Sequence, residues 1–96
     1  MPKNTNQTVK GCFTIANDKG LHTRPSTELV RYASTFKSNI HLTYQKVTVN
    51  AKSLLGILML AATKGTKIYI EAEGEDAQKA VDTIIELSKN KFHIKY

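Results

Sequence analysis

The sequence predicts a two-layer α+β sandwich with the element order β-α-β-β-α-β-α, in which three helices cover one face of a four-stranded antiparallel sheet. Apolar residues recur with a period of about 2 in some segments, typical of strands, and about 3.6 in others, typical of helices. The expected strands carry apolar side chains on one face only, which indicates an antiparallel sheet with one face open to solvent. A chain of 96 residues has room for one core, so we expect a single domain, 1–96.

The first half of the chain predicts a strand, a helix and a second strand. Residues 9–15 alternate between apolar and polar side chains, and the turn residues 17–20 end this strand. From Thr23 the apolar side chains follow one stripe of an amphipathic helix, which we expect to end near residues 35–37. Residues 39–44 then alternate again as the second strand.

The second half predicts two strands and two helices. Residues 47–49 form a third, short strand after a tight turn. Ser53 precedes the apolar run 54–60, which predicts a short helix capped by the serine hydroxyl. Residues 68–73 alternate as the fourth strand, and Asp76 is expected to cap the last helix. The apolar stripe of that helix consists of Ala77, Ala80, Val81, Ile84 and Leu87.

The composition limits the classes of function. The net charge of +6 favours acidic partners, nucleic acid included, although the basic residues are scattered as on an ordinary solvated surface. A single cysteine, Cys12, excludes an internal disulfide and a cysteine metal cluster. The N-terminal residues are polar, and the longest apolar stretch, 54–62, is too short to cross a bilayer. We therefore expect a cytoplasmic protein without membrane insertion.

Neither a cofactor nor a metal is expected. His41 falls on the polar face of a strand and His93 in the C-terminal tail, and neither has a second ligand at metal spacing. The sequence contains no phosphate-binding glycine loop, no dinucleotide fingerprint and no paired carboxylates.

The segment 17–27, N-D-K-G-L-H-T-R-P-S-T, carries the most informative pattern. His22 follows a glycine-containing turn and directly precedes the first expected helix. The first turn of a helix offers unpaired N–H groups and the positive end of the dipole, where a phosphate is readily held. A phosphoryl group on His22 would reach the N–H groups of Thr23 and Arg24, and the Arg24 guanidinium would add a charge-assisted contact. By spacing alone, a structural histidine at a helix start is the alternative.

Three further segments accompany this one: N-A-K-S-L-L-G at 50–56, K-G-T-K-I at 64–68 and A-E-G-E-D-A-Q-K-A at 72–80. Together with G-L-H-T-R-P-S-T-x-L-V at 20–30, they resemble HPr, the histidine-containing phosphocarrier of the bacterial phosphoenolpyruvate-dependent sugar phosphotransferase system. The resemblance covers residues 9–88 in register, which would be the core of the domain. A short polar N-terminal extension and a basic C-terminal tail flank it, and neither has an expected role.

The resemblance implies an open-faced β-sandwich and a carrier rather than an enzyme. His22 would accept a phosphoryl group at Nδ1 from phosphorylated Enzyme I and pass it to a IIA domain of a sugar permease. Arg24 would steady the group during transfer. Thr23 and Ser26 stand where the family often has alanine, and we do not expect Ser26 to abolish transfer. A monomer is expected.

The resemblance also implies a regulatory site and a docking surface. Ser53 matches the serine that an ATP-dependent HPr kinase/phosphorylase modifies in many bacteria, although a plain helix cap is the alternative. Leu54, Leu55 and Leu58 match positions that dock Enzyme I and IIA. With Met59 they are too many apolar side chains for one short helix to bury, whereas Ile57 and Leu60 are better core candidates.

Two other functions remain open at this point. A regulatory HPr paralogue would keep the chemistry and change the acceptor, although the Ser53 motif favours the sugar-type family. A small basic nucleic-acid-binding module would suit the charge. It would also need several exposed aromatic side chains, and only Tyr69 is clearly expected to face outward from a strand.

Overall fold

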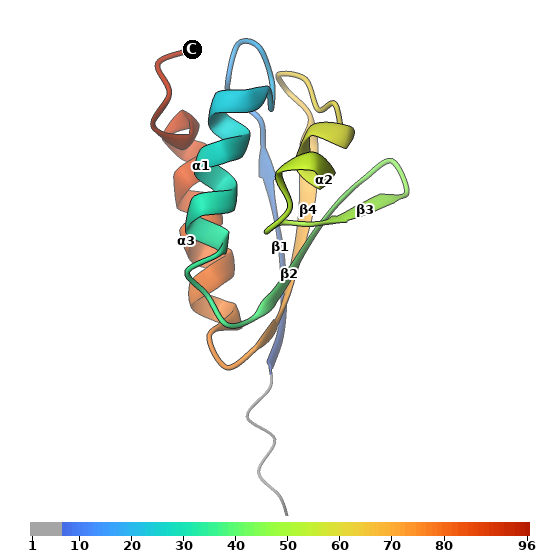
Figure 1. The fold of residues 1–96 in the computed structure, drawn as a ribbon, viewed down its shortest axis with the longest axis vertical. Coiled ribbons are helices and arrows are strands. Elements are labelled where there is room, and N and C mark those ends of the chain that lie inside the picture. The colour runs from blue at the N-terminus through green and yellow to red at the C-terminus, as the bar shows by residue number, and fades with distance from the viewer. Residues whose placement is uncertain (1–6) are drawn as a thin grey trace, which may run out of the picture.

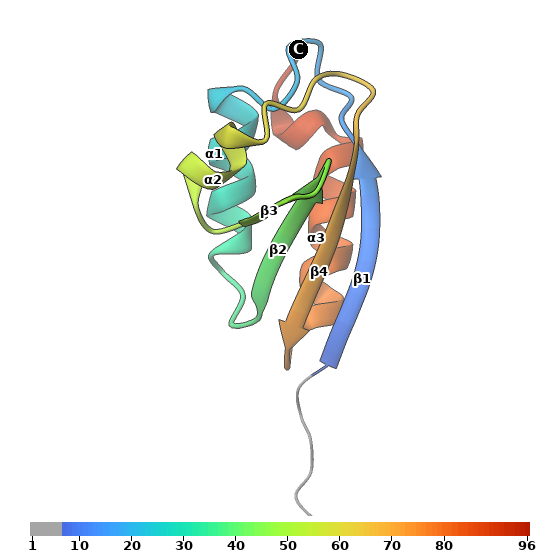
Figure 2. The same cartoon turned by 90° about the vertical axis from the view of Figure 1, so that its right-hand side faces the viewer.

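The computed structural model describes residues 7–96 and shows one antiparallel sheet covered by helices on one face (Figures 1 and 2). The strands lie in the order β1-β4-β2-β3, so the first and last strands in sequence pair with each other and β1 forms one edge of the sheet. This confirms the predicted α+β sandwich and its element order. The strands are β1 (Gln7–Thr14), β2 (Asn39–Tyr44), β3 (Val47–Asn50) and β4 (Lys67–Gly74).

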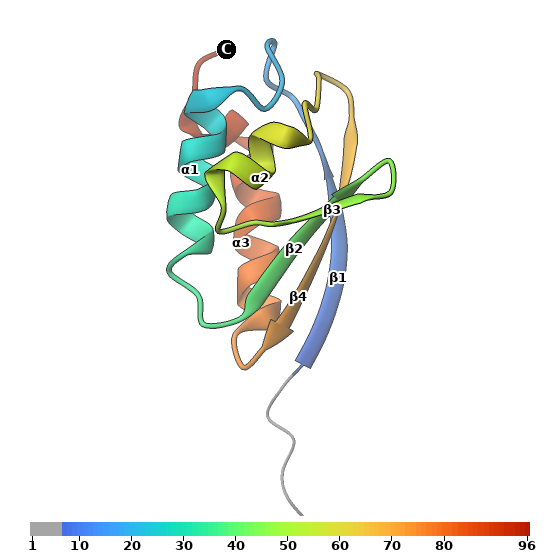
Figure 3. The same cartoon turned by 45° about the vertical axis from the view of Figure 1, so that its right-hand side comes forward.

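Three α-helices and one short 3₁₀-helix complete the described chain. They are α1 (Thr23–Ala33), α2 (Leu54–Met59), α3 (Ala77–Lys89) and η1 (Lys91–His93). Figures 1 and 3 show α1 beside α3, with the short α2 beside α1. The first helix ends at Ala33, earlier than expected, because the chain turns at Ser34 toward β2. None of the helices in this part of the chain has the length and apolar content needed to cross a membrane.

Alternation along the strands separates a buried face from an exposed one. In β4 the side chains of Ile68, Ile70 and Ala72 are buried, whereas Tyr69 between them is 57% exposed, as predicted. The antiparallel register sets Phe13 of β1 opposite Ile68 and brings the apolar faces together. The helices cover this face with their own apolar stripes, which include Leu29, Ala33, Ile57, Ala80 and Ile84.

The buried core includes one side chain beyond the expected core segment 9–88. Phe92 is fully buried and packs its ring edge-to-face on Phe13, with 6.1 Å between ring centroids. The chain reaches this position through three consecutive residues in the left-handed region, Lys91, Phe92 and His93, at φ of 53°, 54° and 64°. Burial of a phenylalanine offsets part of the cost of that conformation. The C-terminal tail is therefore packed against the core through Phe92.

Asp76 occupies the expected position at the start of α3, but its side chain makes no cap hydrogen bond to that helix. Its carboxylate instead accepts hydrogen bonds from the backbone N–H groups of Lys37, at 2.9 Å, and Ser38, at 3.0 Å, and from the Ser38 hydroxyl. These donors, the Ser38 hydroxyl first, lower the pKa of Asp76 to about 2. The residue thus ties the turn after α1 to the start of α3.

Candidate functional site

The loop before α1 is fixed by the loop after α2. Gly20 has a φ of 69°, and a Cβ atom built there would lie 2.2 Å from the Ala62 carbonyl oxygen, so only glycine fits. The next residue, Leu21, is buried and donates its N–H to the same carbonyl at 2.9 Å. These contacts place His22 in a surface pocket that it shares with Thr23 and Leu58.

His22 is the N-cap residue of α1, and its side chain makes no cap hydrogen bond. The carbonyl of His22 accepts the first helical hydrogen bond, from the N–H of Ser26 at 3.1 Å. The preceding amides of Thr23 and Arg24 have no helical acceptor, and Pro25 has no N–H to offer. The buried Ser26 hydroxyl donates to the Leu21 carbonyl at 3.0 Å and so fixes the entry of the helix. The positive end of α1 is therefore open beside the imidazole.

The His22 ring is half-buried, and its two nitrogens differ. Within residues 7–96, Nε2 is buried and has no hydrogen-bond partner. One face of the ring stacks on Tyr96, with 5.9 Å between centroids and 14° between planes. Tyr96 carries no signal in the local sequence, because it lies far from His22 along the chain.

Two cations gather on Tyr96 next to the histidine. Nη1 of Arg24 donates to the Tyr96 hydroxyl oxygen at 3.0 Å, and the guanidinium carbon lies 5.9 Å from the ring centroid. Nζ of Lys19 lies 5.2 Å from the same centroid. The expected phosphate-binding residues Thr23 and Arg24 are thus both exposed at the open helix end. Lys19 is a further cation near this helix end. The arrangement suits an anion.

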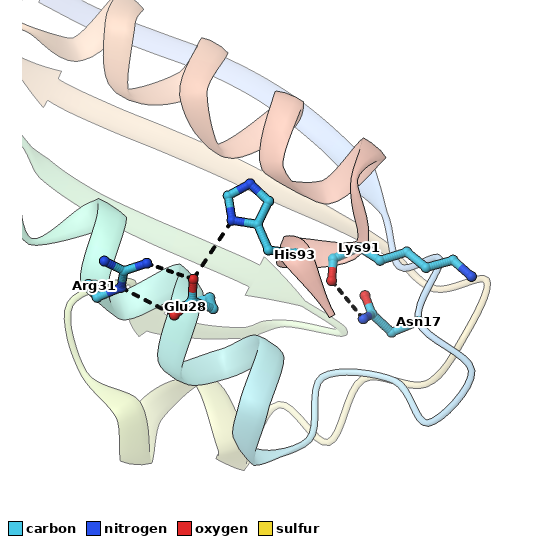
Figure 4. Close-up of polar contacts among 5 residues, drawn as sticks. All are labelled: Asn17, Glu28, Arg31, Lys91 and His93. Atoms are coloured by element: carbon cyan, nitrogen blue, oxygen red, sulfur yellow. Dashed lines mark hydrogen bonds and ion pairs between the residues drawn. The ribbon is translucent and has the colours of Figure 1, made fainter. Parts of the chain in front are cut away.

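Polar contacts hold the tail that carries Tyr96. The Nδ2 group of the buried Asn17 donates to the carbonyls of Lys91, at 2.9 Å, and Tyr96, at 3.1 Å. On the other side, Nδ1 of His93 lies 3.8 Å from the Glu28 carboxylate, which also pairs with Arg31 (Figure 4). The hydrogen bond from Arg31, above all, lowers the pKa of Glu28.

Ser53 lies at the N-cap of α2, and its hydroxyl oxygen accepts a hydrogen bond from the N–H of Gly56 at 3.0 Å. This confirms the predicted serine cap. The residue is half-buried. Unlike the start of α1, the start of α2 therefore satisfies one of its own free amides.

The apolar side chains of the segment 54–60 divide into an exposed set and a buried set, as expected. Leu54 is 37% exposed, Leu55 is 71% exposed and Met59 is 67% exposed, whereas Ile57 and Leu60 are buried. Leu58 is half-buried and lines the pocket of His22. An apolar surface thus adjoins the histidine.

Comparison with known proteins identifies the family. A family model described as "PTS HPr component phosphorylation site" matches residues 9–90. The chain belongs to the HPr family. This HPr-family chain is 41% identical over 81 residues to the phosphocarrier protein HPr of Xylella fastidiosa strain Temecula1, covering 84% of this chain and 91% of that protein. HPr-family membership makes it a phosphocarrier of the phosphotransferase system.

Two further similarities agree with this assignment to the HPr family. The chain is 44% identical over 79 residues to the multiphosphoryl transfer protein of Haemophilus influenzae, covering 79% of this chain and 16% of that protein. The crystal structure of HPr-C-His from Thermoanaerobacter tengcongensis superposes with a TM-score of 0.87 at 34% identity, covering 92% of this chain and 99% of that one. Over the described residues, no group of three or more histidine, cysteine or acidic side chains lies in a position to hold a metal ion.

Proposed function

We propose that His22 accepts a phosphoryl group from phosphorylated Enzyme I and passes it to IIA domains of sugar permeases. One observation carries the proposal: the imidazole lies at the uncapped N-terminus of α1, beside the free amides of Thr23 and Arg24. Family membership supports the class of chemistry, and the geometry supports the residue. We place the protein in the cytoplasm as a single-domain monomer.

Nδ1 is the nucleophile of the proposed transfer. Since Nε2 of His22 is buried, Nδ1 is the ring nitrogen left to face a large donor protein. With the proton on Nε2, the lone pair of Nδ1 attacks phosphorus. The bond from phosphorus to the donor atom breaks, and its electrons return to the donor. The reverse sequence delivers the phosphoryl group to the acceptor.

The surroundings of His22 hold the phosphoryl group between the two transfers. The amides of Thr23 and Arg24 donate to its oxygens along the direction of the helix dipole. The Arg24 guanidinium is exposed and supplies a charge-assisted contact. Because these groups bind an anion but activate no water or leaving group, the protein carries the phosphoryl group and leaves the remaining catalysis to its partners.

The apolar surface of α2 serves as the docking surface in this proposal. Leu58 lines the same surface pocket as His22, and Leu54 and Leu55 are exposed on the same short helix, so a partner that covers this helix also reaches the imidazole. Ser53 lies at the edge of that surface, and we propose it as a regulatory phosphorylation site of an HPr kinase/phosphorylase. A phosphoserine brings about −1.5 to −2 charges at pH 7. Beside a docking surface that meets an acidic partner, this charge would weaken docking.

A labelling experiment tests the function. The protein is incubated with Enzyme I and phosphoenolpyruvate carrying a labelled phosphoryl group. Acid-labile label is expected on the wild type and absent from His22→Ala, whereas His41→Ala and His93→Ala retain it as matched controls. Equal labelling of wild type and His22→Ala would reject His22 as the acceptor. Transfer onward is measured against a panel of purified IIA domains.

A further inference from the structure

Tyr96 lies outside residues 9–90, which the HPr family model matches, yet it contacts both proposed functional side chains. Its ring stacks on His22, with 5.9 Å between centroids and nearly parallel planes. Its hydroxyl oxygen accepts a hydrogen bond from Nη1 of Arg24 at 3.0 Å. Lys19 lies over the same ring, 5.2 Å from the centroid. One aromatic side chain thus links the nucleophile to the nearest cations.

The tail that delivers Tyr96 is fixed at several points. Phe92 anchors it in the core, against Phe13. The buried Asn17, which belongs to the loop before His22, donates to the carbonyls of Lys91 and Tyr96. The left-handed conformations of residues 91–93 persist because these contacts determine the path of the chain. The contact between Tyr96 and His22 is therefore built into the fold.

The His22 imidazole needs such a support. It makes no hydrogen bond to its own helix, and within the described chain its Nε2 atom has no partner, so no hydrogen bond of either kind fixes the ring about the Cβ–Cγ bond. Stacking restricts the ring to orientations parallel to the Tyr96 plane. Arg24 has a long, exposed side chain whose conformational freedom the Tyr96 hydroxyl reduces before any anion arrives.

We propose that Tyr96 is a positioning residue for phosphoryl transfer: it fixes the orientation of the His22 ring and holds the Arg24 guanidinium beside it. The inference rests on the proposed acceptor role of His22. In-line attack requires the Nδ1 lone pair to point at phosphorus, and small errors in such an alignment slow a reaction strongly. Tyr96 acts on the geometry at His22 and not on the docking surface of α2. Its removal therefore affects the turnover of the docked complex rather than its formation.

Tyr96→Leu and Tyr96→Phe test this proposal, with Tyr69→Leu as the matched control on the open face of the sheet. The protein is used as the varied substrate of Enzyme I. Tyr96→Leu is expected to lower kcat about 3- to 10-fold with KM within about twofold of wild type, because orientation and not docking is lost. Tyr96→Phe keeps the stacked ring and releases Arg24, so its kcat is expected to lie between those of wild type and Tyr96→Leu. Tyr69→Leu behaves as wild type.

Histidine NMR gives a second readout, which tests the ring contact on which the proposal rests. The Tyr96 ring current shifts the His22 ring protons, so Tyr96→Leu moves them and Tyr96→Phe does not, while the His41 protons stay in place. An unchanged kcat for Tyr96→Leu, or a raised KM at unchanged kcat, would overturn the positioning role. Wild type that takes no label at His22 would overturn the proposed function itself, and the two failures are distinguished by the wild-type measurement alone.

Discussion

The starts of α1 and α2 use the same kind of helix end in opposite ways. At α2 the Ser53 hydroxyl accepts from the N–H of Gly56 and satisfies its own helix. At α1 the N-cap residue is His22, whose side chain leaves the first amides free. Capping stabilises a helix by about 1 kcal/mol, so the open end costs stability that a serine would supply. Under the proposed function, the fold leaves one helix end open for a phosphoryl group while it closes a neighbouring one.

The largest expected effect comes from replacing His22 at the uncapped N-terminus of α1. His22→Ser and His22→Ala both lose all acid-labile phosphoryl label, because neither retains the imidazole. Against His22→Ala, His22→Ser is expected to be more stable by about 1 kcal/mol, since the hydroxyl caps free amides. Urea unfolding measures the difference. Equal stability of the two variants would mean that the amides at the start of α1 are not available.

The next effect contrasts two side chains of α2. Ile57→Ala removes a fully buried side chain and is expected to lower the free energy of unfolding by about 2–5 kcal/mol. Leu55→Ala, on the same helix but 71% exposed, is expected to change it by less than about 0.5 kcal/mol. Leu55→Ala instead raises KM in the Enzyme I reaction. A KM equal to that of wild type would exclude Leu55 from the docking surface.

A smaller effect follows from removing the serine cap at the N-terminus of α2. Ser53→Ala removes the acceptor for the Gly56 amide and is expected to cost about 1 kcal/mol in urea unfolding. Ser53→Asp keeps a capping oxygen and adds a negative charge. It should therefore retain stability while it weakens docking, seen as a raised KM for Enzyme I. If Ser53→Asp and Ser53→Ala had the same KM, charge at this position would not control docking.

The smallest effect concerns the start of α3, where Asp76 binds the turn before β2 instead of its own helix. Its pKa is lowered from 3.8 to about 2 in the folded state, so the carboxylate form stabilises the fold. This contribution is complete above about pH 4 and is lost as the pH falls toward 2. Relative to Asp76→Asn, wild type is expected to be more stable by about 1 kcal/mol or less at neutral pH. Unfolding across this range should show the difference shrinking; a constant difference would contradict the assignment.

Much of the fold and of the candidate site could be predicted from local patterns. Alternation in residues 68–73 and the apolar stripe of the last helix each reflect one buried face, so they depend on the sequence within that element. Gly20, His22 and Arg24 occur within a few residues of one another, and their placement needs only a turn followed by a helix. The expectation that Leu55 is exposed and Ile57 buried on α2 came instead from the resemblance to HPr, and the structure agrees with it.

The sequence alone determined the order of the elements, the open-faced sheet and the family to which its phosphorylation motif belongs. Only the tertiary structure decided that Phe92 completes the core and that the Tyr96 ring stacks on His22. It also decided that the Tyr96 hydroxyl accepts a hydrogen bond from Arg24, 72 positions away in the chain. It also decided that Asp76 serves another segment rather than its own helix. The physical reason is that such contacts form only once distant segments have packed together. No local period of apolar side chains carries a signal for them.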